Sequence, residues 1–226
     1  MKGNDSMSAS SNTRKLVVMA MLSVIAYAST FVTRQLPPLF LFLQYDPKDI
    51  VIAMGGFILG PIAAFAISFV VSIVEMVTIS DTGPVGMLMN VLASCAFACP
   101  AAFIYKKMHS KKGAVIGLFS GVIAMTLIMI LWNWLITPMY MGVPRQAVVE
   151  MLIPIFLPFN LIKAGINMAL TLLLYKPVVT ALRKAGLVAE HVNQGKVKFL
   201  SSGMLILSVV IVATCVLVVL VIKGVM

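Results

Sequence analysis

Three polar side chains in a strongly apolar segment are spaced so that they share one face of a helix. Asn160, Lys163 and Asn167 lie three and four residues apart. Pro154 and Pro158 precede them, and a proline leaves backbone groups of a helix unpaired where a ligand can use them. A lysine at the centre of a membrane helix costs roughly 2.5–3.5 kcal/mol on insertion scales. A ligand-binding role would explain this cost, and so would a lysine that reaches back to the interface.

A second candidate is the amide of Asn133, which lies between two tryptophans in the run 131–134. The tryptophans alone are typical of a membrane interface. A buried amide, in contrast, needs hydrogen-bond partners, and its donor and acceptor edges suit a planar heterocycle. We therefore expect Asn133 to contact a ligand.

Two further segments hold polar groups at the expected outer ends of helices. Asp46 and Pro47 precede an apolar run, which predicts Asp46 as the N-cap and Pro47 as the first helical residue. A loop there would offer Gln44 to a solute. Glu75 and Asn90 flank the loop 80–86, where each is either an interfacial residue or a ligand contact.

Several kinds of chemistry are not expected. The triplet 81–83 resembles one half of an aspartic protease site, but no second triplet is present to share a proton. No phosphate-binding G-x-x-x-x-G-K-[ST] loop is found. Cys95, Cys99 and Cys215 lie in apolar runs away from both histidines, which predicts neither disulfides nor a metal site. We expect no catalytic residue and no cofactor.

The elements that carry these residues are predicted from composition. Of the 226 residues 61% are hydrophobic and 11% charged, which excludes a soluble globular domain and indicates an all-α membrane protein. Since a bilayer core of about 30 Å needs about 20 apolar residues per helix, we predict helices at 15–33, 48–59, 62–79, 85–105, 113–137, 150–181 and 201–223. The long apolar block at 49–79 is divided at Gly60-Pro61.

Charge gives the expected orientation. With this division, twelve of the seventeen Lys and Arg residues fall on one side of the membrane. We expect this side to be the inner one, because cytoplasmic loops carry an excess of basic residues. The net charge of +10 thus reflects topology, and nucleic acid is not an expected partner. We predict an inner N-terminus and an outer C-terminus. The expected parts are a polar stub at 1–13, a six-helix domain at 14–184, a basic linker at 185–200 and an additional helix within 201–226.

Small residues indicate where helices approach closely. Ala20, Ser23 and Ala26 on the first helix, and the run Gly56–Gly60, allow close packing in lipid. They pack either within the chain or against another membrane subunit.

Together, the motifs over 14–184 resemble the substrate-binding S components of energy-coupling factor (ECF) vitamin transporters, most closely those specific for riboflavin. The resemblance rests on the order of Y-D-P-K-D-I at 45–50, the break at 60–61, the S-D-x-G-P-V-G loop at 80–86, W-N-W-L-x-T-P-x-Y at 132–140 and P-F-N-L-I-K at 158–163. The small residues of the first helix fit the family's docking motif only in part, because Val24 follows Ala20 at the fourth position. The seventh helix lies beyond the usual six.

The resemblance implies a six-helix bundle in a bacterial cell membrane with a vitamin pocket in its outer half. It implies that Asn133, Asn160 and Lys163 contact riboflavin as transported substrate. It also implies three partners, the membrane subunit EcfT and two cytoplasmic ATPases, and a bundle that topples to carry the vitamin inward. Alternatives are an S component for another vitamin or heterocycle, a solitary proton-coupled carrier using Glu75 or Asp81, and an intramembrane enzyme.

Overall fold

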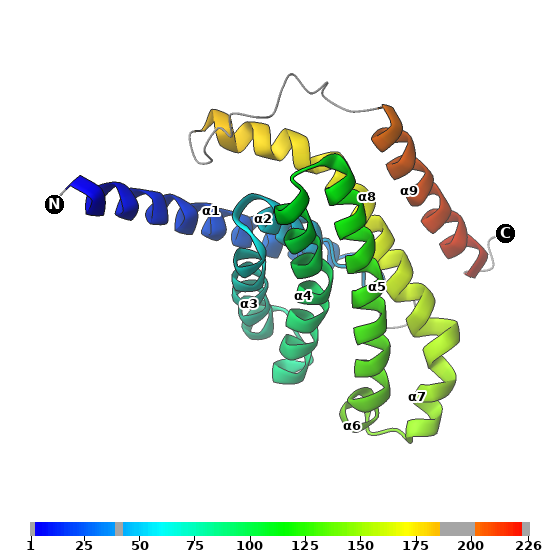
Figure 1. Ribbon diagram of the computed structural model, residues 1–226. Helices are drawn as coiled ribbons and strands as arrows, with labels where there is room; N and C mark the ends of the chain where they lie inside the picture. Colours follow the sequence, from blue (N-terminus) through cyan, green and yellow to red (C-terminus); the bar gives the residue numbers. More distant parts are fainter. Residues whose placement is uncertain (1–2, 39–42, 186–201, 223–226) are drawn as a thin grey trace.

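The structure is a computed structural model that describes residues 3–38, 43–185 and 202–222. All regular elements in these ranges are helices. They are α1 (Gly3–Thr33), α2 (Lys48–Leu59), α3 (Pro61–Thr78), α4 (Gly83–Met108), α5 (Lys111–Leu135), α6 (Thr137–Met141), α7 (Arg145–Met151), the π-helix η1 (Leu152–Phe156), α8 (Leu157–Lys184) and α9 (Ser202–Ile222). Figure 1 shows α3, α4 and α5 side by side, while α1 runs across them with its N-terminal end projecting from the bundle.

Five described segments are long and apolar enough to span a membrane: Asn12–Thr33, Pro61–Thr78, Gly83–Met108, Lys111–Leu135 and Arg145–Leu182. The predicted helix at 48–59 is confirmed, but its 12 residues extend only about 18 Å at 1.5 Å per residue. It therefore does not cross a bilayer core alone. α9, in contrast, has 21 residues, which is the length of one span.

The predicted break between α2 and α3 is confirmed at Gly60-Pro61. Gly60 has φ +100°, a conformation that L side chains rarely adopt, and its N–H donates to the carbonyl of Gly56 at 2.8 Å. Pro61 starts α3, where its missing N–H leaves no helix bond unmade. The chain thus turns sharply and places α2 against α1, α3 and α4.

Glycines in α5 allow the closest helix contact of the bundle. A Cβ at Gly121 would lie 2.2 Å from the carbonyl oxygen of Phe97, and one at Gly117 would lie 2.8 Å from that of Ala101. Gly56 of α2 is similarly close to Ala102. The predicted small residues of α2 therefore pack within the chain and hold α4 at the centre.

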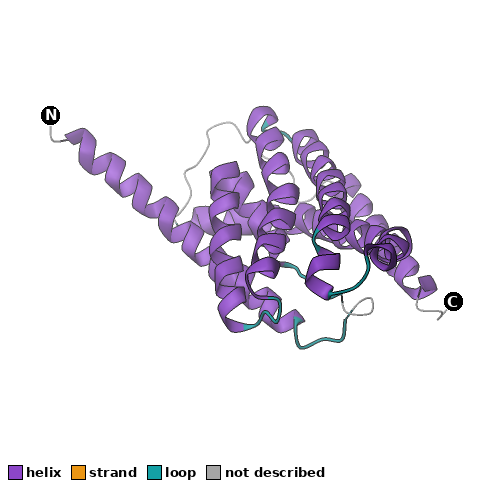
Figure 2. Ribbon diagram, turned by 90° about the horizontal axis from the view of Figure 1, so that it is seen from below, coloured by secondary structure: helices purple, strands orange, loops and turns teal. Residues whose placement is uncertain are grey.

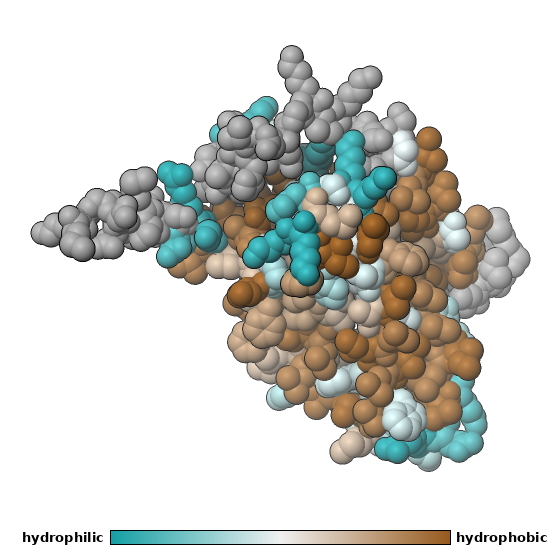
Figure 3. Space-filling view, in the orientation of Figure 1, coloured by the Kyte–Doolittle hydropathy of each residue, from teal (hydrophilic) through white to brown (hydrophobic). Residues whose placement is uncertain are grey.

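On the face that Figure 3 shows, an apolar belt lies between two hydrophilic ends. Exposed side chains such as Ile62, Phe119 and Leu127 contribute to this belt, which is the pattern of a protein that faces lipid. The cluster at 106–112 lies at the end of α4 and α5 that is opposite α6 and α7 (Figure 1).

The structure bears differently on three further expectations. Residues 3–13, predicted as a stub, continue α1 as a helix. Ser23 and Ala26 are buried inside the bundle, so of the predicted docking set only Ala20 is exposed. The physical reason is that a small-residue face is equally suited to neighbouring helices of the same chain, and this face packs against α2 and α3. Most of the linker at 185–200 lies outside the described residues.

The seventh predicted helix, α9, packs on the outside of α8. Gly165 makes room for it, since a Cβ there would lie 3.3 Å from the Sγ of Cys215. Ile162 and Phe159 of α8 are buried in a small apolar cluster with Cys215 and Val219 of α9. Viewed from below, α9 remains at the periphery of the bundle (Figure 2).

Candidate functional site

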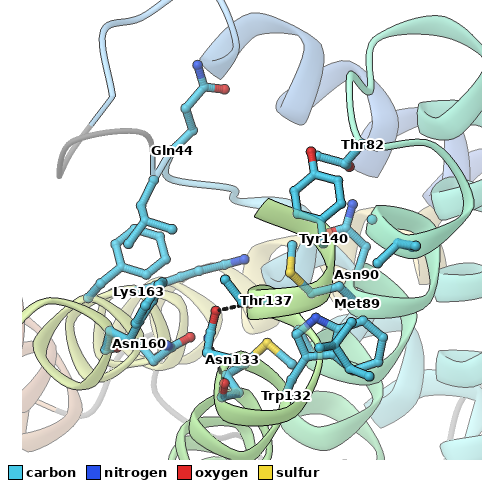
Figure 4. A pocket seen from close by; sticks show the side chains of 18 of the residues that line it. Gln44, Thr82, Met89, Asn90, Trp132, Asn133, Thr137, Tyr140, Asn160 and Lys163 are labelled. Atoms are coloured by element: carbon cyan, nitrogen blue, oxygen red, sulfur yellow. Dashed lines mark hydrogen bonds between the residues drawn. The ribbon is translucent and has the colours of Figure 1, made fainter. Parts of the chain in front are cut away.

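A cavity of about 210 Å³ lies at the end of the bundle that carries α6 and α7. Its walls come from α4, α5, α6 and α8, and the segment before α2 covers one side. Apolar side chains such as Met125, Met129 and Trp132 form one part of the lining. Polar side chains converge on the other part, as Figure 4 shows. Convergent polar groups in an apolar pocket are typical of a small-molecule site.

Asn133 is held at the end of α5. Its Nδ2 donates to the Met129 carbonyl at 2.6 Å, and its Oδ1 accepts a hydrogen bond from the Thr137 hydroxyl at 2.9 Å. The two flanking tryptophans have different environments: Trp132 lines the cavity, whereas Trp134 is exposed, with the guanidinium of Arg145 5.5 Å from its ring centroid. The interface interpretation thus fits Trp134 alone.

Asn160 lies in the first turn of α8, which follows the π-helix. Pro158 has no N–H, and the N–H of Leu157 instead donates to the carbonyl of Leu152, five residues back. The widened turn precedes Asn160, whose Nδ2 donates to the Phe156 carbonyl at 2.7 Å. Within the described chain, the Oδ1 of Asn160 accepts no hydrogen bond. A carbonyl-type acceptor is therefore available at the cavity wall.

Lys163, one turn further along α8, places its ammonium at the same cavity. Its Nζ lies 3.7 Å from Asp49 Oδ2 and 3.8 Å from Asp46 Oδ2. Both distances exceed the 2.7–3.2 Å of a normal N–H···O hydrogen bond. The two carboxylates thus stabilise the charge of Lys163, while its donors remain unused by the described residues.

Beneath the cavity, a network of buried charges joins the segment before α2 to α2 and α3. Lys48 forms ion pairs with Asp46, at 2.8 Å, and with Glu75. Asn90 donates to Glu75 Oε2 at 3.1 Å, and Ser94 donates to Asp49. The network therefore anchors α2 to α3 and α4, and through Lys163 it reaches α8.

Residues 45 and 46 fasten the segment before α2 to this network. The Tyr45 hydroxyl donates to Asn167 Oδ1 at 2.7 Å, and the Thr30 hydroxyl donates to Asp46 at 2.8 Å. Burial opposes ionisation of Asp46, but the ammonium groups of Lys48 and Lys163 outweigh it and hold the pKa of Asp46 well below its usual range. Asp46 is not the N-cap that the sequence predicts. The helix begins at Lys48 with Pro47 as N-cap, because Asp46 is engaged in ion pairs.

The eight predicted ligand residues separate into two groups. The cavity lining includes Gln44, Asn90, Asn133, Asn160 and Lys163. Asp46, Glu75 and Asn167 belong to the network behind it, and each acts on the cavity only through another residue. Figure 4 shows the amide of Gln44 pointing away from Asn133 and Asn160.

Sequence reasoning missed several residues of this region. Arg34, Thr137 and Tyr140 line the cavity. Lys48 and Asp49, at the start of α2, are almost fully buried. The sequence feature that indicates their burial is a pair of opposite charges at the start of a strongly apolar helix, where a charge needs a partner.

Comparisons with known proteins agree with this architecture. The family model for the substrate-specific component of ECF transporters matches residues 14–175. The chain is 32% identical over 159 residues to the riboflavin transporter FmnP of Bacillus subtilis (strain 168), a match over 66% of this chain and 84% of that protein. It is 28% identical over 177 residues to the riboflavin transporter RibU of Staphylococcus aureus (strain TCH60), over 76% and 93% of the two chains.

A solved structure of an S component, described as "Structure and mechanism of the S component of a bacterial ECF transporter", matches with a TM-score of 0.65 at 28% identity. The match covers 76% of this chain and 99% of that one. The expected fold class is thereby confirmed: a six-helix S-component bundle, here with α9 in addition. The protein is a multi-pass protein of the bacterial cell membrane and a transport component, not an enzyme. The chain belongs to the family of substrate-specific components of ECF transporters.

Proposed function

We propose that this S component binds riboflavin in the cavity between α4, α5, α6 and α8. The observation that carries the proposal is a pair of groups on α8 that no described residue hydrogen-bonds: the ammonium of Lys163 and the Oδ1 of Asn160, one turn apart at the wall of the same cavity. Two of the relatives are named as riboflavin transporters, which supports the choice of ligand.

The chemistry of the lining fits a flavin. A flavin has a flat aromatic ring system, one edge of which carries carbonyl oxygens and ring nitrogens, and a ribityl chain of hydroxyl groups. Met89, Met129 and Trp132 provide the soft, apolar contacts that a ring face prefers. Lys163 offers donors and Asn160 an acceptor for the polar edge or the hydroxyl chain.

The size of the cavity adds a condition. Its 210 Å³ is below the roughly 300–1,000 Å³ of typical ligand pockets, and a three-ring heterocycle with a five-carbon chain needs more. We therefore expect the segment before α2, which carries Gln44, to move outward when the ligand binds. Tyr45 and Asp46 would then act as its fixed end, because both are bonded to the network below.

Riboflavin fluorescence tests the ligand directly. Titration of the purified protein should quench the fluorescence of added riboflavin with saturation at one equivalent, and FMN, thiamine and biotin serve as competitors. If another heterocycle displaces riboflavin at lower concentration, the ligand assignment fails while the site remains. Absence of both quenching and flavin absorbance would overturn the proposal.

Energy for uptake is proposed to come from partner subunits. The sequence has no nucleotide-binding loop, and the family implies EcfT and two cytoplasmic ATPases. Ala20 and Val24 lie on the exposed side of α1, which supports this side as the docking face in place of Ser23 and Ala26. The basic cluster at 106–112, at the end of the bundle opposite the cavity, supports a cytoplasmic position for that end and an outward-facing cavity. An inner N-terminus and an outer C-terminus remain part of this proposal.

A further inference from the structure

The buried network beneath the cavity has an odd number of charges. Two ammonium groups, Lys48 and Lys163, meet three carboxyl groups, Asp46, Asp49 and Glu75. They form one connected set, since Lys48 joins Asp46 to Glu75 and Lys163 joins Asp46 to Asp49. With every group ionised, the set carries one net negative charge.

This excess charge is deeply buried. Asp49 is fully buried, and Lys48 and Glu75 are each 1% exposed. A buried charge without a partner costs several kcal/mol, so such groups neutralise instead. Arg34 is the other cation at the cavity, and it makes no ion pair with these carboxyl groups in the described parts of the chain. The network therefore needs one more positive charge.

The hydrogen bonds indicate which carboxyl group takes up this positive charge as a proton. Both oxygens of Asp46 are engaged, Oδ1 by Thr30 and Oδ2 by Lys48. Both oxygens of Asp49 are also engaged, Oδ1 by Ser94 and Oδ2 by Asn167. Glu75 differs, because Oε2 accepts from Lys48 and Asn90 whereas its buried Oε1 has no partner among the described residues.

We propose that Oε1 of Glu75 holds a proton in the ligand-free protein at neutral pH, so that the buried network is electrically neutral. The proton comes from water, and the O–H bond formed at Oε1 leaves Oε2 as the carbonyl oxygen that accepts from Lys48 and Asn90. A buried neutral hydroxyl without a hydrogen-bond partner costs less free energy than a buried carboxylate oxygen without one. The inference goes beyond vitamin binding and does not depend on which vitamin the cavity takes.

The elements packed against Glu75 bring both signs of charge to it. The charged groups that face it are Lys48 from α2, Asp46 from the preceding segment and Lys163 from α8. From α4 it meets the neutral Asn90, and the nearby Tyr27 of α1 is bonded to Thr78. No further cation reaches Oε1 from the described helices.

Infrared spectroscopy of the full-length protein in lipid nanodiscs tests the proposal. At pH 7 the wild type should show the carbonyl stretch of a protonated carboxylic acid, with the usual small downshift in D2O. Glu75→Gln should remove this band. Gln has the shape of the neutral acid, so this variant should melt close to the wild type.

Asp81→Asn is the matched control, because Asp81 is exposed in the loop between α3 and α4, and the band should persist. Absence of the band in the wild type overturns the proposal whether or not any variant folds. Persistence of the band in Glu75→Gln overturns the assignment to Glu75. A band that appears only after sodium is replaced by N-methylglucamine would also overturn it, because a bound cation would then be supplying the charge. Riboflavin quenching on the same wild-type sample tests the proposed function separately.

Discussion

Replacement of Lys163 by Met would separate its contact with the ligand from its role in the buried network. In the proposed complex the ligand loses a hydrogen bond from a charged donor, worth about 1.5–3 kcal/mol. At 1.4 kcal/mol per tenfold change, the Kd for riboflavin should rise roughly 10- to 150-fold. The same change also leaves Asp46 and Asp49 without the ammonium that lies 3.8 and 3.7 Å from them.

The second effect is a loss of stability. With Glu75 neutral, Lys163→Met leaves two carboxylates opposite Lys48 alone, and breaking a buried ion pair costs about 3–5 kcal/mol. The ligand-free variant should therefore unfold at a clearly lower temperature. The double variant Lys163→Met/Asp49→Asn removes the excess charge, so it should regain most of this stability.

The two variants are compared by riboflavin fluorescence titration and by thermal unfolding without ligand. We expect Lys163→Met/Asp49→Asn to recover stability but not affinity. Lys112→Met is the control, since Lys112 is exposed at the far end of the bundle, and both measurements should stay at the wild-type value. If the double variant binds riboflavin as tightly as the wild type, Lys163 does not contact the ligand, and the proposed site is wrong.

Three further perturbations have defined outcomes. Asn160→Ala should raise the Kd for riboflavin about tenfold, for one hydrogen bond of about 1–1.5 kcal/mol, with little change in melting temperature; an unchanged Kd would remove Asn160 from the site. Gly121→Ala should lower stability by about 1–3 kcal/mol, because its Cβ meets the Phe97 carbonyl at 2.2 Å, and Ser120→Ala beside it should cost less; equal unfolding temperatures would contradict the close contact of α4 and α5. A chain that ends at residue 185 should still bind riboflavin, since α9 lies outside the matched residues 14–175 and makes most of its contacts with the outer side of α8; loss of binding in a folded truncated protein would show that α9 supports the cavity wall, where Leu43 packs in the same cluster as Cys215 and Val219.

Local patterns predicted the features that depend on local physics. The break at Gly60-Pro61 follows from the conformational limits of two residues, and the structure places it there. Asn133, Asn160 and Lys163 were selected because each is costly in an apolar helix, and all three line one cavity. The two prolines before Asn160 predicted unpaired backbone groups, and a π-helix occupies that position.

Features that depend on distant partners were not predictable in the same way. Lys48 and Asp49 look like surface charges in the sequence, because a charge at a helix end has the same pattern whether it faces water or lies under a neighbouring segment. Lys48 and Asp49 are buried because α2 packs against α3 and α4. Likewise, the small face at Ser23 and Ala26 does not specify which neighbour it meets, and in the structure the neighbour is the same chain.

The neutral network has a consequence for the electrical behaviour of the transporter. One elementary charge that crosses a membrane potential of 100 mV gains or loses about 2.3 kcal/mol. A bundle that carried the unbalanced charge of Asp46, Asp49 and Glu75 through this field would do electrical work in each cycle. With the proton on Glu75, the five groups sum to zero, and any movement of the bundle relative to the bilayer transfers no charge through them. Collapse of the membrane potential by an ionophore should therefore exert no force on the bundle through these five groups.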